Sequence, residues 1–205
     1  EVAYQPGETV WTSWDFGAGG TTSIWFFHLI QIHTQSGRLL TGLRYFDFYE
    51  SHGQGARHYR EVVEAKWLAW GKPAMRAVGD PFTLTARESA GSWFESLKDD
   101  SHPFKIHCVP SGCMGKSIET MAESGRQFLT FVFDQNGKRV PRALFDASLK
   151  TGLNHLASWG YPTDQDGRPI PGSKPKHDEH SDAGTAYYYG TFYIEPTVDK
   201  PVDID

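Results

Sequence analysis

Apolar and polar side chains follow a two-residue alternation along IWFFHLIQIH, the run from Ile24 to His33. Successive side chains of a strand point to opposite faces, and here both faces are largely apolar, so we expect a strand that is covered on both sides. His28 lies on one of these apolar faces and is expected to be a hydrogen-bonded core histidine. A second aromatic run, Leu39 to Tyr49, follows the polar loop Thr34 to Arg38, and this spacing predicts a β-hairpin.

The later part of the chain predicts a second hairpin and a helix. The run from Gln127 to Phe133 reads as a strand, and Arg139 to Leu144 reads as its return. Asn136-Gly137 between them is typical of a type I′ turn, in which both central residues need positive φ. A helix that ends at Gly160 is predicted by apolar residues at spacings of four, four and three: Phe145, Leu149, Leu153 and Leu156.

Two aromatic segments are less clear. The segment from Arg57 to Trp70 fits a helix or a strand, because its branched and aromatic residues suit both. The last aromatic run, Ala186 to Ile194, is expected to form a strand. Glycine and proline recur between residues 71 and 103, and they predict short strands and loops there.

The predicted fold is therefore mainly β. We expect a single β-sandwich or barrel-like domain with a C-terminal covering helix and long extensions, and a length of 205 residues suits one domain. The expected division is an N-terminal arm over residues 1–23, a β-rich domain over 24–159 and a C-terminal extension over 160–205.

Charge and hydropathy narrow the possible partners. The formal net charge is −5, and Lys and Arg are scattered among acidic residues, so no basic stripe is available for phosphates and no nucleic-acid partner is expected. No apolar run approaches the roughly 18 residues that a membrane span needs. The first residue is Glu1 rather than Met, which favours an exported protein in the periplasm or outside the cell.

The two cysteines, Cys108 and Cys113, lie in the loop HCVPSGC. A pair with four residues between its members can close a small ring. The redox-active signature has only two intervening residues, and a zinc site needs two further ligands that the sequence does not offer at a suitable spacing. The pattern favours a local disulfide, which also agrees with an oxidising compartment.

Four segments in this region occur in a distinctive order. They are FKIHCVPSGC from Phe104, IETMAESG from Ile118, FLTFVFDQNGKRV from Phe128 and SLKTGLNHL from Ser148. Their succession between about Phe104 and Trp159 resembles the C-terminal half of the invasion-associated locus B family. The resemblance implies a small exported β-rich domain and a disulfide between Cys108 and Cys113, with no catalytic residues to carry over.

A polysaccharide-lyase-like enzyme is one alternative. Gln31 and His33 resemble the Gln-Ile-His strand of alginate-lyase-like jelly rolls, and Tyr189 in the tyrosine-rich run could be the partner that delivers a proton. The Arg-bearing strand that this family has upstream of the Gln-Ile-His strand is missing, because no arginine precedes Gln31.

A metal-binding protein is the second alternative. The run HDEHSD contains a His-x-x-His pair with flanking carboxylates, and His177, His180 and Asp182 are its candidate ligands for a divalent metal.

Taken together, the sequence predicts a non-catalytic accessory protein rather than an enzyme. The expected partner is a larger envelope or membrane-bound enzyme complex, on which the chain docks through its N-terminal and C-terminal extensions. No cofactor is expected.

Overall fold

The computed structural model describes residues 2–17, 20–79, 118–168, 170 and 172–194. Its centre is a five-stranded mixed sheet with the strand order β4-β1-β2-β3-β7. The strands are β1 (Val10–Asp15), β2 (Thr21–His33), β3 (Leu39–His52), β4 (Met75–Gly79) and β7 (Ala143–Phe145). Strand β2 is antiparallel to both β1 and β3, whereas β4 runs parallel to β1 and β7 runs parallel to β3.

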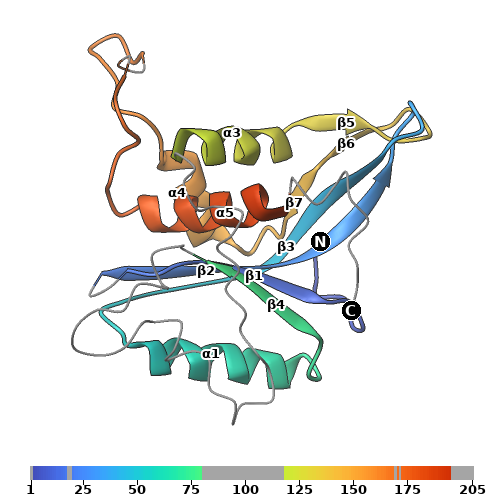
Figure 1. Cartoon of the computed structure of the whole chain (residues 1–205), viewed down its shortest axis with the longest axis horizontal. Coiled ribbons are helices and arrows are strands. Elements are labelled where there is room, and N and C mark those ends of the chain that lie inside the picture. Colours follow the sequence, from blue (N-terminus) through green and yellow to red (C-terminus); the bar gives the residue numbers. More distant parts are fainter. Residues whose placement is uncertain (1, 18–19, 80–117, 169, 171, 195–205) are drawn as a thin grey trace.

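Helices cover both faces of this sheet (Figure 1). One face carries α1 (Ala56–Ala69). The other carries α5 (Ser181–Ile194), which packs on β1, β2 and β4 and is flanked by α3 (Ile118–Phe128) and α4 (Lys150–Ser158). A small hairpin of β5 (Phe131–Phe133) and β6 (Arg139–Pro141) lies beside the tip of the β2–β3 hairpin, joined to it by the bridge between Thr34 and Asp134.

The alternation along β2 explains why the core has two halves. Ile24 and Phe26 join the cluster under α1, whereas Trp25 and Phe27 join the cluster under α5. Side chains of consecutive strand residues point to opposite faces, so one strand contributes to both clusters. The predicted hairpin of two doubly covered strands is confirmed.

His28 is the predicted buried, hydrogen-bonded histidine. Its side chain is fully buried; Nδ1 lies 3.0 Å from the carbonyl oxygen of Thr9, and the backbone N–H of Gln5 donates to Nε2 over 3.1 Å. An acceptor at Nδ1 and a donor at Nε2 select the Nδ1–H tautomer. This histidine therefore has a structural role in the core.

The predicted fold class is wrong. The chain is mixed α/β, because the segment Arg57–Trp70 is mostly helix α1 and the final aromatic run is part of helix α5 rather than a strand. Tyr59, Val63 and Trp67 recur every four residues and bury one face of α1. A β-sandwich needs a second sheet over the first, whereas here helices occupy that position on each face.

The segments expected to be arms contribute core elements. Strand β1, within residues 1–23, lies between β4 and β2, and helix α5, within residues 160–205, covers the sheet. In the described part of the chain, no helix is long and apolar enough to cross a membrane. The periplasmic or secreted location stays a prediction.

The second predicted hairpin is confirmed only in part, as β5–β6. Gln127 and Phe128 belong to helix α3, Ala143 and Leu144 belong to β7 in the main sheet, and the turn differs from the expected type. Gly137 has a φ of 75°, but Asn136 is not among the described residues with positive φ. The Asp134 carboxylate accepts the backbone N–H groups of Asn136 and Lys138 at 2.9 and 2.8 Å. This side chain holds the turn closed without a second left-handed residue.

Candidate active site

Three polar side chains form a row across one end of the sheet. Asp15, at the end of β1, is the cross-strand partner of Ser23 in β2, and Ser23 is the partner of Glu50 in β3. Residues directly opposite each other in antiparallel strands point to the same face. Ser13, two positions before Asp15, contacts Gly190 of α5, so the row lies on the face that α5 covers.

Glu50 is held at both of its carboxylate oxygens. The hydroxyl of Ser23, itself fully buried, donates to Oε2 over 2.8 Å, and Nε2 of His155 on α4 lies 3.2 Å from Oε1. A carboxylate can only accept, so His155 donates at Nε2. Nδ1 of His155 lies 2.8 Å from Nδ1 of His180. With both rings neutral, His180 donates in this contact, and its Nε2 lies 3.8 Å from Oε1 of Glu179.

Asp182 lies in the first turn of α5 beside this network. Burial raises the pKa of its carboxyl group, and the negative charge of Glu50 raises it further, whereas His177 and His155 lower it. The start of the helix is fixed to the sheet because Nε1 of Trp25 donates to the carbonyl oxygen of Ala183 over 2.8 Å. Asp182 is therefore a carboxylate whose charge is costly to bury and whose position is well defined.

The donor set suits a hard divalent cation. Asp15 and Asp182 supply carboxylate oxygens, Glu50 adds negative charge beside them, and a cation would offset the cost of burying the Asp182 charge. No three His, Cys, Asp or Glu side chains among the described residues are close enough together to hold a metal alone. Mg²⁺ is commonly bound by one or two carboxylates together with waters and substrate phosphates, so this set fits Mg²⁺.

Strand β4, which is parallel to β1, ends at the same end of the sheet as the row of Asp15, Ser23 and Glu50. Its last residue, Gly79, is paired with Trp14, the neighbour of Asp15. The sequence continues with Asp80, and residues 80–117 lie outside the described part of the chain. Cys108 and Cys113 also fall in that range, so their disulfide stays a prediction.

The three residues predicted as metal ligands lie together at this site. His180 is linked to Glu50 through His155. Nδ1 of His177 lies 3.2 Å from the Ser181 hydroxyl. The pKa of Asp182 is shifted by the charges of His177, Glu50 and His155. Their role as ligands stays a prediction. The sequence interpretation missed the rest of the site, namely Asp15, Ser23, Glu50 and His155. Cross-strand register and the packing of α4 bring these residues together, and neither is visible in local sequence patterns.

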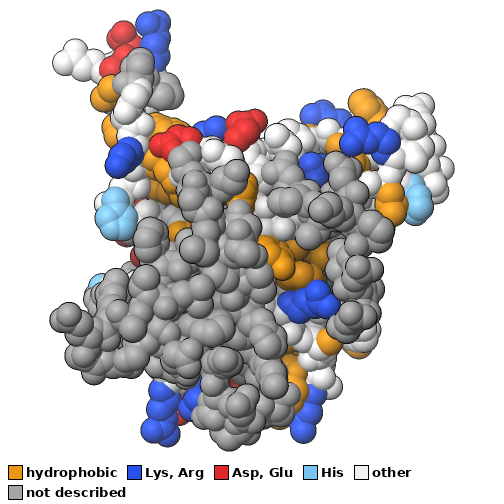
Figure 2. Space-filling model, in the orientation of Figure 1, with side chains coloured by type: hydrophobic (Ala, Val, Ile, Leu, Met, Phe, Trp, Pro, Cys, Tyr) orange, Lys and Arg blue, Asp and Glu red, His pale blue; other side chains and the backbone are white. Residues whose placement is uncertain are grey.

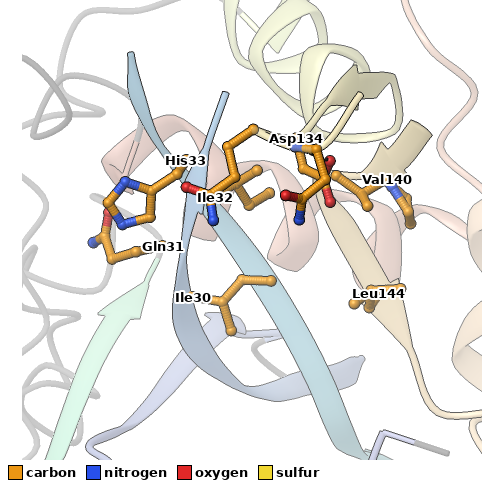
Figure 3. Close-up of a pocket in the computed structure, with 10 residues that line it drawn as sticks. Ile30, Gln31, Ile32, His33, Asp134, Val140 and Leu144 are labelled. Carbon is orange, nitrogen blue, oxygen red and sulfur yellow. Dashed lines mark hydrogen bonds between the residues drawn. The ribbon is translucent and has the colours of Figure 1, made fainter. Parts of the chain in front are cut away.

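The residues of the lyase alternative do not form one site. Gln31 and His33 line a pocket of about 310 Å³ at the opposite end of β2 (Figure 3). Figure 3 shows them on one side of this pocket, with Asp134 and Val140 on the other. Tyr189 is not among the lining residues; it is buried in α5 as part of the main core.

No family model matches the sequence, and no curated protein matches it. Solved structures of phage proteins share the fold. The large terminase of one thermophilic bacteriophage superimposes with a TM-score of 0.61 at 15% identity, covering 95% of this chain and 42% of that one. The chain thus spans about two-fifths of the length of that terminase.

Separate nuclease domains match over most of both chains. The large terminase nuclease of the thermophilic phage G20c, solved with bound magnesium, gives a TM-score of 0.52 at 14% identity and covers 92% of this chain and 83% of that one. The nuclease domain of the P22 large terminase gives 0.54 at 11% identity, with 96% and 89% covered. The fold is therefore the RNase H-like fold of large terminase nuclease domains.

These matches contradict the resemblance to the invasion-associated locus B family. The segment IETMAESG, which is part of that resemblance, does not end an element at Gly125: helix α3 continues to Phe128, and Gly125 packs inside it against Tyr188. The interpretation as a non-catalytic accessory protein without a nucleic-acid partner is also wrong, because the domains that share the fold are nucleases. Of the interpretations drawn from the sequence, the metal-binding alternative agrees best with these findings.

Proposed function

We propose that the chain is a metal-dependent DNA nuclease domain whose active site is the sheet end that carries Asp15, Glu50 and Asp182. The observation that supports it is the placement of these carboxylates, from β1, β3 and α5, on one face of a fold whose solved examples include a terminase nuclease with bound magnesium. The proposal concerns only the nuclease activity, because this chain spans about two-fifths of the large terminase that it matches.

The chain's own residues have distinct tasks in this proposal. Asp15 and Asp182 would hold the metal, and Mg²⁺ or Mn²⁺ held there would supply Lewis-acid activation of water and positive charge for the phosphate. Ser23 and His155 use both oxygens of Glu50, so Glu50 serves to orient His155 and adds negative charge beside the cation. Trp25 keeps the first turn of α5, and with it Asp182, above the sheet.

The test is cleavage of plasmid and linear duplex DNA with Mg²⁺, with Mn²⁺ and with EDTA. Asp15→Asn and Asp182→Asn are each expected to lower the cleavage rate about 100-fold or more, because each removes a negative ligand without a large change in shape. Calorimetry should show weaker Mn²⁺ binding by the same variants.

Asp166→Asn is the matched control, since Asp166 is exposed in a turn away from the row. It should cleave DNA at the rate of the unchanged chain. A purified, folded chain that cleaves no DNA with either metal, or that cleaves equally well in EDTA, would contradict the proposal.

A further inference from the structure

The chain between α4 and α5 leaves the body of the protein and returns to it. We call residues 160–176 the excursion. Its two ends are joined because the N–H of Lys176 donates to the carbonyl oxygen of Gly160 over 2.9 Å, and farther out Ile170 donates to Pro162 over 2.9 Å. Figure 1 shows this segment in orange, standing away from α4 and α5. Figure 2 shows that it carries charged side chains.

The returning end of the excursion is fixed at Lys176. Besides the bond from its N–H, its carbonyl oxygen accepts the indole N–H of Trp159 over 2.7 Å. The preceding Pro175 faces the body, where it lines a cavity of about 100 Å³ with Trp159 and Tyr161. Lys174 and Lys176, on either side of this inward-facing proline, are both exposed on the same anchored stretch of backbone.

Neither of the two lysines has an ion-pair partner among the described residues, and the same holds for Arg38 and Lys138. Lys174 and Lys176 are distinguished by the anchored backbone that carries both of them. Two exposed cations on an anchored backbone contribute little to the stability of the fold. They are well suited to an anionic partner, because the backbone that carries them is already ordered before binding.

The lysine pair lies next to the candidate active site. His177, the residue after Lys176, has Nδ1 3.2 Å from the hydroxyl of Ser181, which immediately precedes Asp182 in the chain. An anion held by the lysines therefore lies at the margin of the carboxylate site. Carboxylates repel a polyanion, so a substrate with phosphates needs cations nearby to bind.

We propose that Lys174 and Lys176 bind the phosphate backbone of duplex DNA beside the site of cleavage. The inference rests on the proposed nuclease function and adds the surface that holds the substrate. Lysines at phosphates neutralise charge and release counterions, so they contribute affinity that does not depend on sequence and that weakens as salt rises.

The experiment compares two double variants with the unchanged chain by fluorescence anisotropy on a labelled DNA duplex in EDTA, where no cleavage is expected. Lys174→Gln with Lys176→Gln should weaken binding about 10-fold, and the slope of log affinity against log salt should become shallower by about 1.8, that is about 0.9 for each lost phosphate contact. The control, Arg38→Gln with Lys138→Gln, removes the same charge from exposed residues in the turns of the β2–β3 and β5–β6 hairpins. These turns lie at the end of the molecule opposite to the excursion (Figure 1).

The control variant should keep its affinity within about a factor of two of the unchanged chain, and its salt slope should be unchanged. Equal losses in the two variants would show a general charge effect and overturn the inference, as would a lysine variant that binds like the unchanged chain. If the unchanged chain cleaves DNA in these cases, the nuclease proposal stands and only the inference fails. An unchanged chain that neither binds nor cleaves DNA overturns both.

Discussion

His155 Nε2 lies 3.2 Å from Oε1 of Glu50, so a side chain of α4 is tied to a carboxylate on β3. The side chains are only 14% and 20% exposed, which means that water competes little for either group. The same imidazole contacts His180 in the segment that leads into α5. One ring thus links the sheet, α4 and the start of the helix that carries Asp182.

We expect His155→Phe to impair cleavage more than it impairs folding. The change removes both hydrogen bonds of the ring and keeps an aromatic side chain, so Glu50 and His180 lose their common partner. Loss of such an outer contact typically costs about 10–100-fold in activity or metal affinity. The measurement is the cleavage rate over a range of Mn²⁺ concentrations. His155→Gln, which keeps a donor, should recover part of the rate, and the distal His33→Gln should have no effect. Full activity of His155→Phe would refute this role.

Asp182→Asn should stabilise the metal-free protein at neutral pH, although it lowers the cleavage rate. Burial raises the pKa of this carboxyl group in the folded state, so folding favours the protonated form. Ionised Asp182 lowers the free energy of unfolding. This loss of stability is absent below the carboxyl pKa of the unfolded chain, about 3.9, and is complete above the raised pKa of the folded chain. The melting temperature of Asp182→Asn should therefore exceed that of the unchanged chain increasingly as the pH rises from the unfolded to the folded pKa, and the two should be alike at lower pH. Melting temperatures of both proteins, measured in EDTA over a range of pH, test this expectation.

The same series in Mg²⁺ should reverse the order, because a metal that binds only the folded unchanged chain raises its melting temperature. A variant that is less stable than the unchanged chain in EDTA at neutral pH would show that Asp182 is stabilised by contacts other than a cation. Equal responses of both proteins to Mg²⁺ would place the metal elsewhere.

Gly184→Ala should destabilise the fold by about 1–3 kcal/mol. A Cβ at this position in α5 would overlap the six-membered ring of Trp159, whose indole N–H also holds the carbonyl of Lys176. The ring cannot move without releasing that bond. Gly160→Ala is the control, because a Cβ there meets nothing within 4 Å. Denaturant unfolding of both variants measures the difference. A loss as large in Gly160→Ala would exclude the overlap as the cause.

Local sequence patterns predicted those elements that are formed by residues close together in the sequence. The β2–β3 hairpin and the core histidine His28 follow from short-range periodicity. The helix before Gly160 follows from it only in part, because α4 begins at Lys150 and Phe145, the first of the predicted helical positions, belongs to strand β7. Helix α5 did not, because ten of its residues are buried and almost no polar face remains to reveal a helical period. A short aromatic run without such a face resembles a buried strand.

The candidate site was only partly predictable for a related reason. His177, His180 and Asp182 are close together in the sequence, so the sequence alone indicates a cluster of possible metal ligands. Asp15 and Glu50 are single carboxylates at the ends of aromatic strands, and only the register of three strands shows that they share a row. Register depends on long-range pairing, which a single sequence does not display.

Trp25→Phe should lower cleavage by more than its effect on stability explains. The indole N–H of Trp25 donates to the carbonyl oxygen of Ala183 over 2.8 Å, and this bond fixes the first turn of α5 over the sheet. Loss of the bond and of part of the ring should cost about 1–3 kcal/mol.

Trp14→Phe is a matched control on the opposite face of the sheet. Trp14 is also fully buried, and its indole N–H donates over 2.8 Å to the Thr12 hydroxyl, within the cluster under α1. Unfolding should show similar losses for the two variants, because each removes one buried hydrogen bond and a similar volume. Cleavage rates measured well below both melting temperatures should fall only for Trp25→Phe, since only that bond positions the turn that carries Asp182. Equal rates would mean that packing on the sheet suffices to place α5 without this hydrogen bond.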